Sequence, residues 1–270
     1  MEWKNIYRGF IMGASDVIPG VSGGTIAILL GIYDRLIAAI NGLFSKEWKK
    51  HLYFLIPLGL GIVLALFSLS RLMEWLFEMH QASTYIFFLG LIIGVLPFLL
   101  NQANAKNTFK RQHYVLLLIG ALIIASIKFM HPSEGDIIEN ITLSTYMLLF
   151  VSGFIGSCAM ILPGVSGSFM LLIIGVFPTV ISAISNFQLD IIAVTGTGIA
   201  IGMLTMSKVI HYFLTHYHTG TFAIIIGMVI GSIFVIFPGW PEQLNGFLIN
   251  GFIFCVGLLT AYLLGKVEYK

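Results

Sequence analysis

The chain contains a series of apolar runs, each long enough to cross a lipid bilayer. A transmembrane helix needs about 20 mainly apolar residues, and 58% of the 270 residues are hydrophobic while only 10% are charged. Unpaired backbone groups are not tolerated in lipid, so such a chain must cross it as helices or as a closed barrel of strands. The runs lack the alternating pattern of barrel strands. The sequence therefore predicts an all-α polytopic membrane protein.

Two of the apolar runs are interrupted by the same cluster of residues. P-G-V-S-G-G-T occupies 19–25 and P-G-V-S-G-S-F occupies 163–169. Aligning 10–40 with 154–184 gives eleven identities, which indicates an internal duplication. Proline removes a backbone donor and glycine permits unusual dihedral angles, so each cluster is expected to end one half-helix and begin another inside the membrane.

Each duplicated unit is predicted to hold one broken or re-entrant helical hairpin followed by three transmembrane helices. The first repeat, 1–140, has its hairpin at 9–43 and its spans at 52–70, 84–100 and 114–130, and the second repeat, 141–270, has its hairpin at 144–184 and its spans at 189–206, 220–237 and 246–264. Three is an odd number, so the second hairpin must open on the opposite side of the membrane. This arrangement is an inverted-topology repeat, which is typical of transporters. Whether each hairpin is re-entrant or fully spanning is left open.

Two G-x-x-x-G pairs occupy similar places in the two halves. Gly90 and Gly94 lie in L-G-L-I-I-G, and Gly227 and Gly231 lie in I-G-M-V-I-G. Small residues at this spacing let membrane helices approach closely. We therefore expect both pairs to lie at helix contacts.

The charges predict an orientation. Basic residues gather at the start of the chain, near 46–50, 106–111 and 208, and at the end, whereas the segments 71–83, 131–143 and 238–245 carry mostly acidic residues. The positive-inside rule places both termini in the cytoplasm. A net charge of +2 is too small to indicate nucleic acid as a partner, so membrane lipids are the expected surroundings.

The two breaks supply candidate binding residues. The start of a helix offers unpaired N–H groups and a partial positive charge, which suit a phosphate or a carboxylate. Ser22 and Ser166 are suited to cap such a start, and Thr25 and Ser168 add hydroxyl groups just inside it. The candidate substrate-binding residues are Ser15, Asp16, Gly20, Ser22, Gly23, Gly24, Thr25, Gly164, Ser166, Gly167 and Ser168.

Charged residues around the first break have several interpretations. Asp16, whose counterpart in the second repeat is Met160, could carry a proton, pair with a cation or cap local N–H groups. A continuous helix from the first break would return Asp34 and Arg35 to the cytoplasmic interface. There they could form a surface pair, or act in headgroup binding or coupling.

No metal or other cofactor is expected. Cys158 and Cys255 lie in apolar segments without a second cysteine or a histidine at metal-ligand spacing. His211, His216 and His218 fall in a predicted short loop without carboxylate or cysteine partners. Such a group is more typical of a solvated loop than of a metal site.

The chain resembles the bacterial polyprenyl-phosphate transporter family. The similar stretches are G-A-S-D-V-I-P-G-V-S-G-G-T-I-A-I-L-L-G-I-Y-D-R-L-I, S-C-A-M-I-L-P-G-V-S-G-S-F-M-L-L-I-I-G-V-F, F-F-L-G-L-I-I-G-V-L-P-F at 87–98 and S-K-V-I-H-Y-F-L-T-H-Y-H from Ser207. The resemblance implies a plasma-membrane translocase that returns undecaprenyl phosphate, the carrier lipid of wall-polymer synthesis, from the outer to the inner leaflet. It does not imply an enzyme.

Two other functions stay open, as does assembly into a homo-oligomer. A membrane phosphatase acting on undecaprenyl diphosphate would need a nucleophile, an acid or base and a basic clamp. The first break offers Asp16 and Ser22, but no Glu, His or Arg lies near either break in sequence. A coupled transporter of a small anion would use the helix starts equally well.

Overall fold

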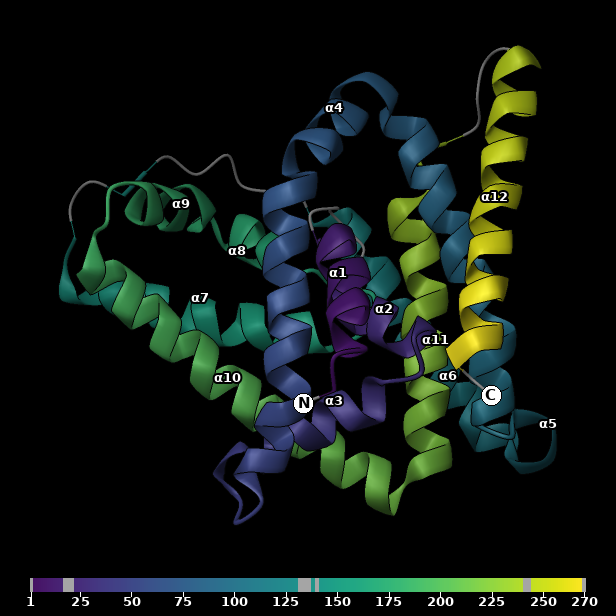
Figure 1. Ribbon diagram of the computed structural model, residues 1–270, viewed down its shortest axis with the longest axis horizontal. Coiled ribbons are helices and arrows are strands. Elements are labelled where there is room, and N and C mark those ends of the chain that lie inside the picture. The colour runs from purple at the N-terminus through teal and green to yellow at the C-terminus, as the bar shows by residue number, and fades with distance from the viewer. Residues whose placement is uncertain (1, 17–21, 131–136, 139–140, 240–243, 269–270) are drawn as a thin grey trace.

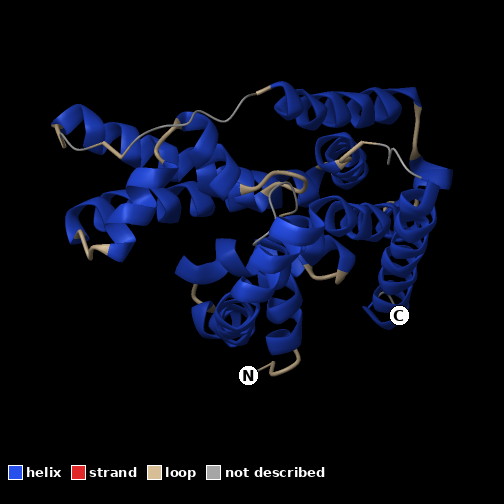
Figure 2. Cartoon of the chain, turned by 90° about the horizontal axis from the view of Figure 1, so that it is seen from above, coloured by secondary structure: helices blue, strands red, loops and turns tan. Residues whose placement is uncertain are grey.

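The computed structural model describes residues 2–16, 22–130, 137–138, 141–239 and 244–268. Throughout these ranges the regular structure is helical, and no strand occurs in them (Figure 2). The helices are α1 (Asn5–Asp16), α2 (Gly23–Leu29), α3 (Tyr33–Asn41), α4 (Trp48–Gln102), α5 (Ala105–Thr108), α6 (Arg111–Ser126), α7 (Leu143–Ile161), α8 (Gly167–Ile174), α9 (Phe177–Ser185), α10 (Leu189–His216), α11 (His218–Ile236) and α12 (Leu244–Glu268). The predicted all-α class is confirmed.

Seven segments of the described chain are long and apolar enough to cross a membrane. They are Trp48–Leu69, Met79–Gln102, Arg111–Phe129, Leu143–Ile161, Leu189–His216, His218–Ile236 and Gly246–Lys266. Their outward faces are apolar, as at Leu122 and Phe252, which are 60% and 71% exposed. Such side chains suit contact with lipid. The protein is therefore a multi-pass membrane protein, and each of the six predicted spans outside the hairpins corresponds to one of these segments.

Helix α4 differs from the prediction. The predicted spans 52–70 and 84–100 leave 71–83 as a connection outside the membrane, but α4 continues through this segment and leaves helical geometry only at His80, where φ is −137° and ψ is 35°. The segment is rich in Leu, Met, Glu and Gln and contains neither glycine nor proline, so it favours a helix despite its charges. The two predicted spans are therefore two arms of one kinked helix.

Both hairpins contain a second break that the sequence did not reveal. Each predicted hairpin, 9–43 and 144–184, has one break, but α2 also gives way to α3 and α8 also gives way to α9, with an angle of 113° between α8 and α9. Gly31 and Gly175 lie at these breaks with φ of 62° and 85°. Positive φ is strained for residues other than glycine. Matching positions of the two hairpins therefore use glycine for the same turn.

Glycines bring the long helices into close contact. A Cβ atom built at Gly90 on α4 would lie 2.3 Å from the Phe254 carbonyl oxygen on α12. One built at Gly227 on α11 would lie 2.0 Å from the Leu117 carbonyl oxygen on α6. The predicted role of the G-x-x-x-G pairs in close packing is confirmed.

Matching elements of the two halves form matching contacts. The first arm of α4 packs on α1 as α10 packs on α7, and the second arm of α4 packs on α12 as α11 packs on α6 (Figure 1). The start of α1, the turn after α3, helix α5 and the corner between α10 and α11 lie in the lower half of Figure 1, whereas the bend of α4 and the start of α12 lie at the top. Most of the basic segments therefore lie toward one end of the molecule.

Candidate functional site

The two P-G-V-S-G breaks contact each other. The backbone N–H of Gly164 donates to Thr25 Oγ1 at 2.9 Å and is 3.3 Å from Ser22 Oγ. The Ser22 hydroxyl also lies 3.3 Å from the Leu162 carbonyl oxygen, to which it can donate. Residues about 140 positions apart in the chain therefore share one buried hydrogen-bonded junction.

The first break has the predicted cap. Ser22 has extended dihedral angles, φ −112° and ψ 149°, and its Oγ accepts from the Thr25 backbone N–H at 3.2 Å. This geometry satisfies one of the backbone donors that the start of a helix leaves unpaired. The prediction that Ser22 caps a half-helix is confirmed.

The start of α2 also packs against the C-terminal end of α7. A Cβ atom built at Gly24 would lie 2.8 Å from the Ile161 carbonyl oxygen, so only glycine permits this approach. The same carbonyl accepts from the Tyr33 hydroxyl at 3.3 Å. Carbonyl groups at the C-terminal end of a helix lack partners within it. Side chains from the first hairpin therefore satisfy the end of α7.

The second break is built differently. Ser166 occupies the N-cap position of α8, but its side chain makes no capping bond and instead shares a hydrogen bond with Ser168 Oγ at 2.8 Å. The expected cap is therefore wrong in detail, because a second hydroxyl two residues on competes for the Ser166 side chain. Gly164 has φ of 85°, and Gly167 packs against the Gly156 carbonyl oxygen of α7.

The two half-helix starts differ in burial. Each residue of α2, from Gly23 to Leu29, is buried. Helix α8 contains no buried residue, and Ser168 at its first turn is exposed. The start of α8 is therefore the more accessible of the two in this conformation.

The remaining candidates of the first hairpin lie apart from this junction or outside the described part. Ser15 is buried, and its hydroxyl donates to the Met12 carbonyl oxygen at 2.6 Å within α1. Asp16 ends α1, but its side chain falls outside the described part of the chain, as does Gly20 entirely. Among the described residues, the Ser15 hydroxyl is bonded within α1 and not to the junction.

Asp34 and Arg35 have separate surroundings. Arg35 makes an ion pair with Glu2 at 2.7 Å, and its guanidinium lies 5.0 Å from the centre of the Phe54 ring. Asp34 is partly buried, and its Oδ1 has no hydrogen-bond partner among the described residues. Burial raises the pKa of this carboxyl group, although the nearby His218 opposes the rise. Arg35 therefore belongs to an ion pair at the surface, whereas the Asp34 side chain is partly buried.

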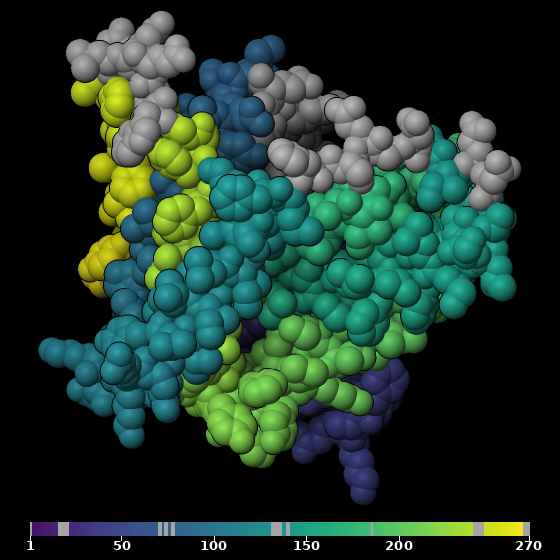
Figure 3. All heavy atoms as spheres, turned by 180° about the vertical axis from the view of Figure 1, so that it is seen from behind, coloured from purple at the N-terminus to yellow at the C-terminus, as the bar shows by residue number. Residues whose placement is uncertain are grey.

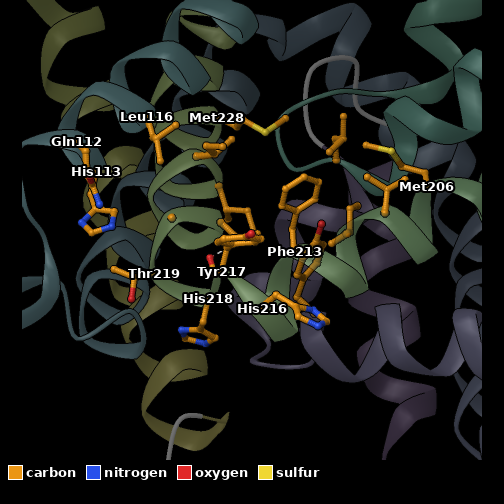
Figure 4. A pocket seen from close by; sticks show the side chains of 18 residues that line it. Gln112, His113, Leu116, Met206, Phe213, His216, Tyr217, His218, Thr219 and Met228 are labelled. Carbon is orange, nitrogen blue, oxygen red and sulfur yellow. Dashed lines mark hydrogen bonds between the residues drawn. The ribbon is translucent and has the colours of Figure 1, made fainter.

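A cavity of about 660 Å³ leads to the junction. It lies between α6, α10 and α11, and its lining includes Leu162 of the second break and Tyr33 of α3. Met228, at the inner end in Figure 4, has its carbonyl oxygen only 3.0 Å from a Cβ atom built at Gly164. In Figure 3, the teal α6 region and the light-green corner between α10 and α11 lie side by side at the surface. The cavity therefore reaches from that corner to Leu162 at the edge of the junction, whereas Ser22, Thr25 and Gly164 do not line it.

The sequence did not predict this cavity, because the corner is not a loop. Helix α10 continues to His216 and α11 begins at His218, which leaves a single residue between them. The mouth carries Gln112, His113, His216, Tyr217, His218 and Thr219. Three polar lining residues, His216, Tyr217 and His218, lie in the run from Ser207 to His218, but the contribution of α6 could be seen only in the fold.

Comparison with known proteins identifies the family of this chain. The family profile described as VCA0040-like, undecaprenyl phosphate translocase-like, matches residues 12–249. A polyprenyl-phosphate transporter of Staphylococcus aureus is 44% identical over 98% of this chain and 97% of its own length. A polyprenyl-phosphate transporter of Vibrio cholerae is 38% identical over 91% of this chain and 80% of its own length. No solved structure shows a significant match. The chain therefore belongs to the VCA0040-like family of undecaprenyl phosphate translocase-like proteins.

Proposed function

We propose that this protein is a translocase that carries undecaprenyl phosphate from the outer to the inner leaflet of a bacterial plasma membrane. The observation that carries the proposal is the junction, where Gly164 N–H of one break meets Thr25 and Ser22 of the other. The names of the relatives, both polyprenyl-phosphate transporters, support the substrate class. The protein acts as a transporter and not as an enzyme.

The substrate explains why the site combines helix starts with an apolar cavity. A lipid monophosphate presents an anion that can be held by helix N-termini without a lysine. The cavity volume of about 660 Å³ is that of a site for a drug-sized ligand. It can hold the headgroup and the first isoprene units, while the rest of the chain stays in the bilayer. The protein then moves only a headgroup between leaflets.

We propose that the halves form an inverted repeat that alternates between two access states. The matching contacts of α1 with α4 and α7 with α10, together with the matching turns at Gly31 and Gly175, support a shared ancestral unit. In the present conformation the start of α2 is buried and that of α8 is accessible. Exchange of these two environments between the halves would move the site from one side of the membrane to the other.

The orientation follows from the basic segments. Those at the start of the chain, after α3, around α5 and near the α10–α11 corner share one end of the molecule, which supports a cytoplasmic location for that end and for both termini. The cavity mouth at the α10–α11 corner then faces the cytoplasmic leaflet. We propose on this basis that this conformation is an inward-facing state, from which undecaprenyl phosphate is delivered to the cytoplasmic leaflet.

Leaflet exchange in proteoliposomes tests the proposal. The purified protein should accelerate exchange of fluorescent undecaprenyl phosphate but not of undecaprenol, which has the same tail without the phosphate. Failure to accelerate exchange of the phosphate lipid, together with efficient flux of a soluble anion, would favour the small-anion transporter.

The same preparation tests the phosphatase alternative. A serine nucleophile needs an adjacent base, whereas the Ser22 hydroxyl contacts the Thr25 hydroxyl, the Gly164 N–H and the Leu162 carbonyl oxygen. None of these groups is a general base. Release of phosphate from undecaprenyl diphosphate that disappears in Ser22→Ala would refute the translocase assignment.

A further inference from the structure

A wall separates the cavity from the paired breaks. Ser22, Thr25 and Gly164 are buried and do not line the cavity. Leu162 does line it, while the Leu162 carbonyl oxygen lies 3.3 Å from Ser22 Oγ. Among the described residues, a single residue therefore stands between the cavity and the junction at this point.

Tyr33 completes this wall from the first hairpin. It lines the cavity, although only 5% of its surface is exposed. Its hydroxyl donates to the Ile161 carbonyl oxygen at 3.3 Å. The same oxygen lies 2.8 Å from a Cβ atom built at Gly24, in the first turn of α2. The Tyr33 hydroxyl and the start of α2 therefore approach one oxygen atom, and the tyrosine does so from the cavity wall.

The atoms at this boundary belong to the negative end of a helix. Ile161 is the last residue of α7 and Leu162 is its C-cap. Carbonyl groups at a helix C-terminus carry a partial negative charge, which repels a phosphate. The Tyr33 hydroxyl covers the first of these carbonyl groups and the Ser22 hydroxyl covers the second. Two hydroxyl groups of the first hairpin therefore hold the end of α7 between the cavity and the junction.

The bond from Tyr33 can be broken at small cost and is found in one repeat only. Among the described residues it is the only hydrogen bond of the Tyr33 side chain. Tyr33 begins α3, directly after the turn at Gly31, and the duplicated sequences align it with Phe177, which begins α9. Phenylalanine keeps the ring and lacks the hydroxyl. The fold therefore accepts phenylalanine at the equivalent helix start, but only the first repeat can make this bond.

We infer that Tyr33 is the gate between the cavity and the paired breaks. While its hydroxyl is bonded to Ile161, the wall is closed, and when that bond breaks the ring can leave the wall and open the route to the junction. The inference rests on the proposed function, in which a phosphate headgroup takes this route. Tyr33 is thus a positioning residue, because it controls when the headgroup reaches the junction and does not hold it there.

The accessibility of a cysteine at the junction tests the gate. The reporter is Val165→Cys, next to Gly164, at a position that is 5% exposed and packs in one cluster with Met228 of the cavity wall. The full chain, with both native cysteines replaced by alanine, is placed in phosphatidylcholine nanodiscs and labelled with a water-soluble maleimide. The test variant is Tyr33→Phe. The matched control is Tyr217→Phe, since Tyr217 lines the same cavity but is 59% exposed.

The gate predicts that Tyr33→Phe accelerates labelling of Val165→Cys by about two- to tenfold, which is the factor that one neutral hydrogen bond contributes to an equilibrium. Tyr217→Phe should leave the rate unchanged. A second reporter, Ala183→Cys, is fully buried in the separate core cluster around α9 and should label at one rate in all three proteins. Unchanged labelling of Val165→Cys in Tyr33→Phe would overturn the gate. So would equal acceleration at both reporters, because it would indicate general loosening.

Leaflet exchange by the wild-type protein tests the proposed function separately. Absence of exchange of fluorescent undecaprenyl phosphate, with labelling that still depends on Tyr33, would contradict translocation and leave the gate in place. Normal exchange, with labelling that does not depend on Tyr33, would support translocation and overturn the gate.

Discussion

Replacing Gly24 by alanine should force the two breaks apart. The added Cβ atom would lie 2.8 Å from the Ile161 carbonyl oxygen, which is 0.6 Å short of the 3.4 Å at which ordinary contact begins. Overpacking of this kind costs roughly 1–3 kcal/mol. A shift of the same size would lengthen the 2.9 Å bond from Gly164 N–H to Thr25 Oγ1 to about 3.5 Å, which removes about 1 kcal/mol more.

Together these two costs destabilise the conformation in which α2 is buried by about 2–4 kcal/mol. If the opposite access state lacks this contact, its population relative to the present state should rise by roughly 30-fold to 1,000-fold. The readout is the rate at which a water-soluble maleimide labels Ile26→Cys, a position on α2 that is 2% exposed, in a background with Cys158→Ala and Cys255→Ala. Labelling should accelerate by about thirtyfold or more.

The control is Gly196→Ala, because a Cβ atom at that helical position would meet nothing within 4 Å. Alanine there should leave labelling of Ile26→Cys unchanged, and it should slightly stabilise the helix. Equal labelling rates for Gly24→Ala, Gly196→Ala and the parent, all confirmed as monodisperse, would refute the conclusion that the contact with α7 keeps α2 buried.

Three further changes have defined outcomes. Thr25→Val removes the closer acceptor of Gly164 N–H and leaves only Ser22 Oγ at 3.3 Å. Thermal unfolding in detergent should therefore show a free energy of unfolding lower by about 1–2 kcal/mol. An unchanged free energy of unfolding would contradict the junction. Gly227→Ala places a Cβ atom 2.0 Å from the Leu117 carbonyl oxygen and should destabilise by roughly 1–3 kcal/mol, whereas Gly251→Ala, with open space around it, should not. Burial raises the pKa of Asp34 above its ordinary value of 3.8, so the folded state binds this proton more tightly than the unfolded state and stability should fall as pH rises above that value. Asp34→Asn should remove this part of the pH dependence, and an identical melting profile between pH 4 and pH 8 for both proteins would contradict the assignment.

The large features of the fold could be predicted because they depend on composition and local chemistry. Long apolar runs need helices in lipid, proline and glycine in P-G-V-S-G end them, and a serine at the next helix start caps it. Ser22 behaves in this way. Glycine at four-residue spacing predicted helix contacts, since the absence of a side chain at Gly90 or Gly227 matters whichever helix approaches.

Other features depend on tertiary context. A lone glycine in an apolar run is compatible with a straight helix, so the turns at Gly31 and Gly175 show only as positive φ in the folded chain. The hydroxyl of Ser166 had two possible partners, and the folded backbone places it on Ser168. In α4, local helix preference outweighed the charges that had suggested a loop.

The cavity also depends on tertiary context, and the sequence indicated even less of it. His216 and His218 lie near each other in sequence, but His113 comes from a helix about 100 residues earlier, and only packing of α6 on α11 brings it to the same mouth. Periodicity describes one helix at a time. The partner of each helix, and therefore any site between helices, is determined by long-range packing that a single sequence does not display.

Photo-crosslinking tests the central claim most directly, namely that the phosphate end of the lipid meets the paired breaks. The probe is a polyprenyl phosphate with a diazirine on the isoprene unit next to the phosphate, bound to the protein in nanodiscs and mapped by mass spectrometry. The account predicts adducts in peptides that contain 19–25, 163–169 or the inner cavity wall around Met228, and competition by unlabelled undecaprenyl phosphate. Adducts confined to the lipid-facing sides of α6 and α12, or adducts that undecaprenyl phosphate does not compete away, would contradict it.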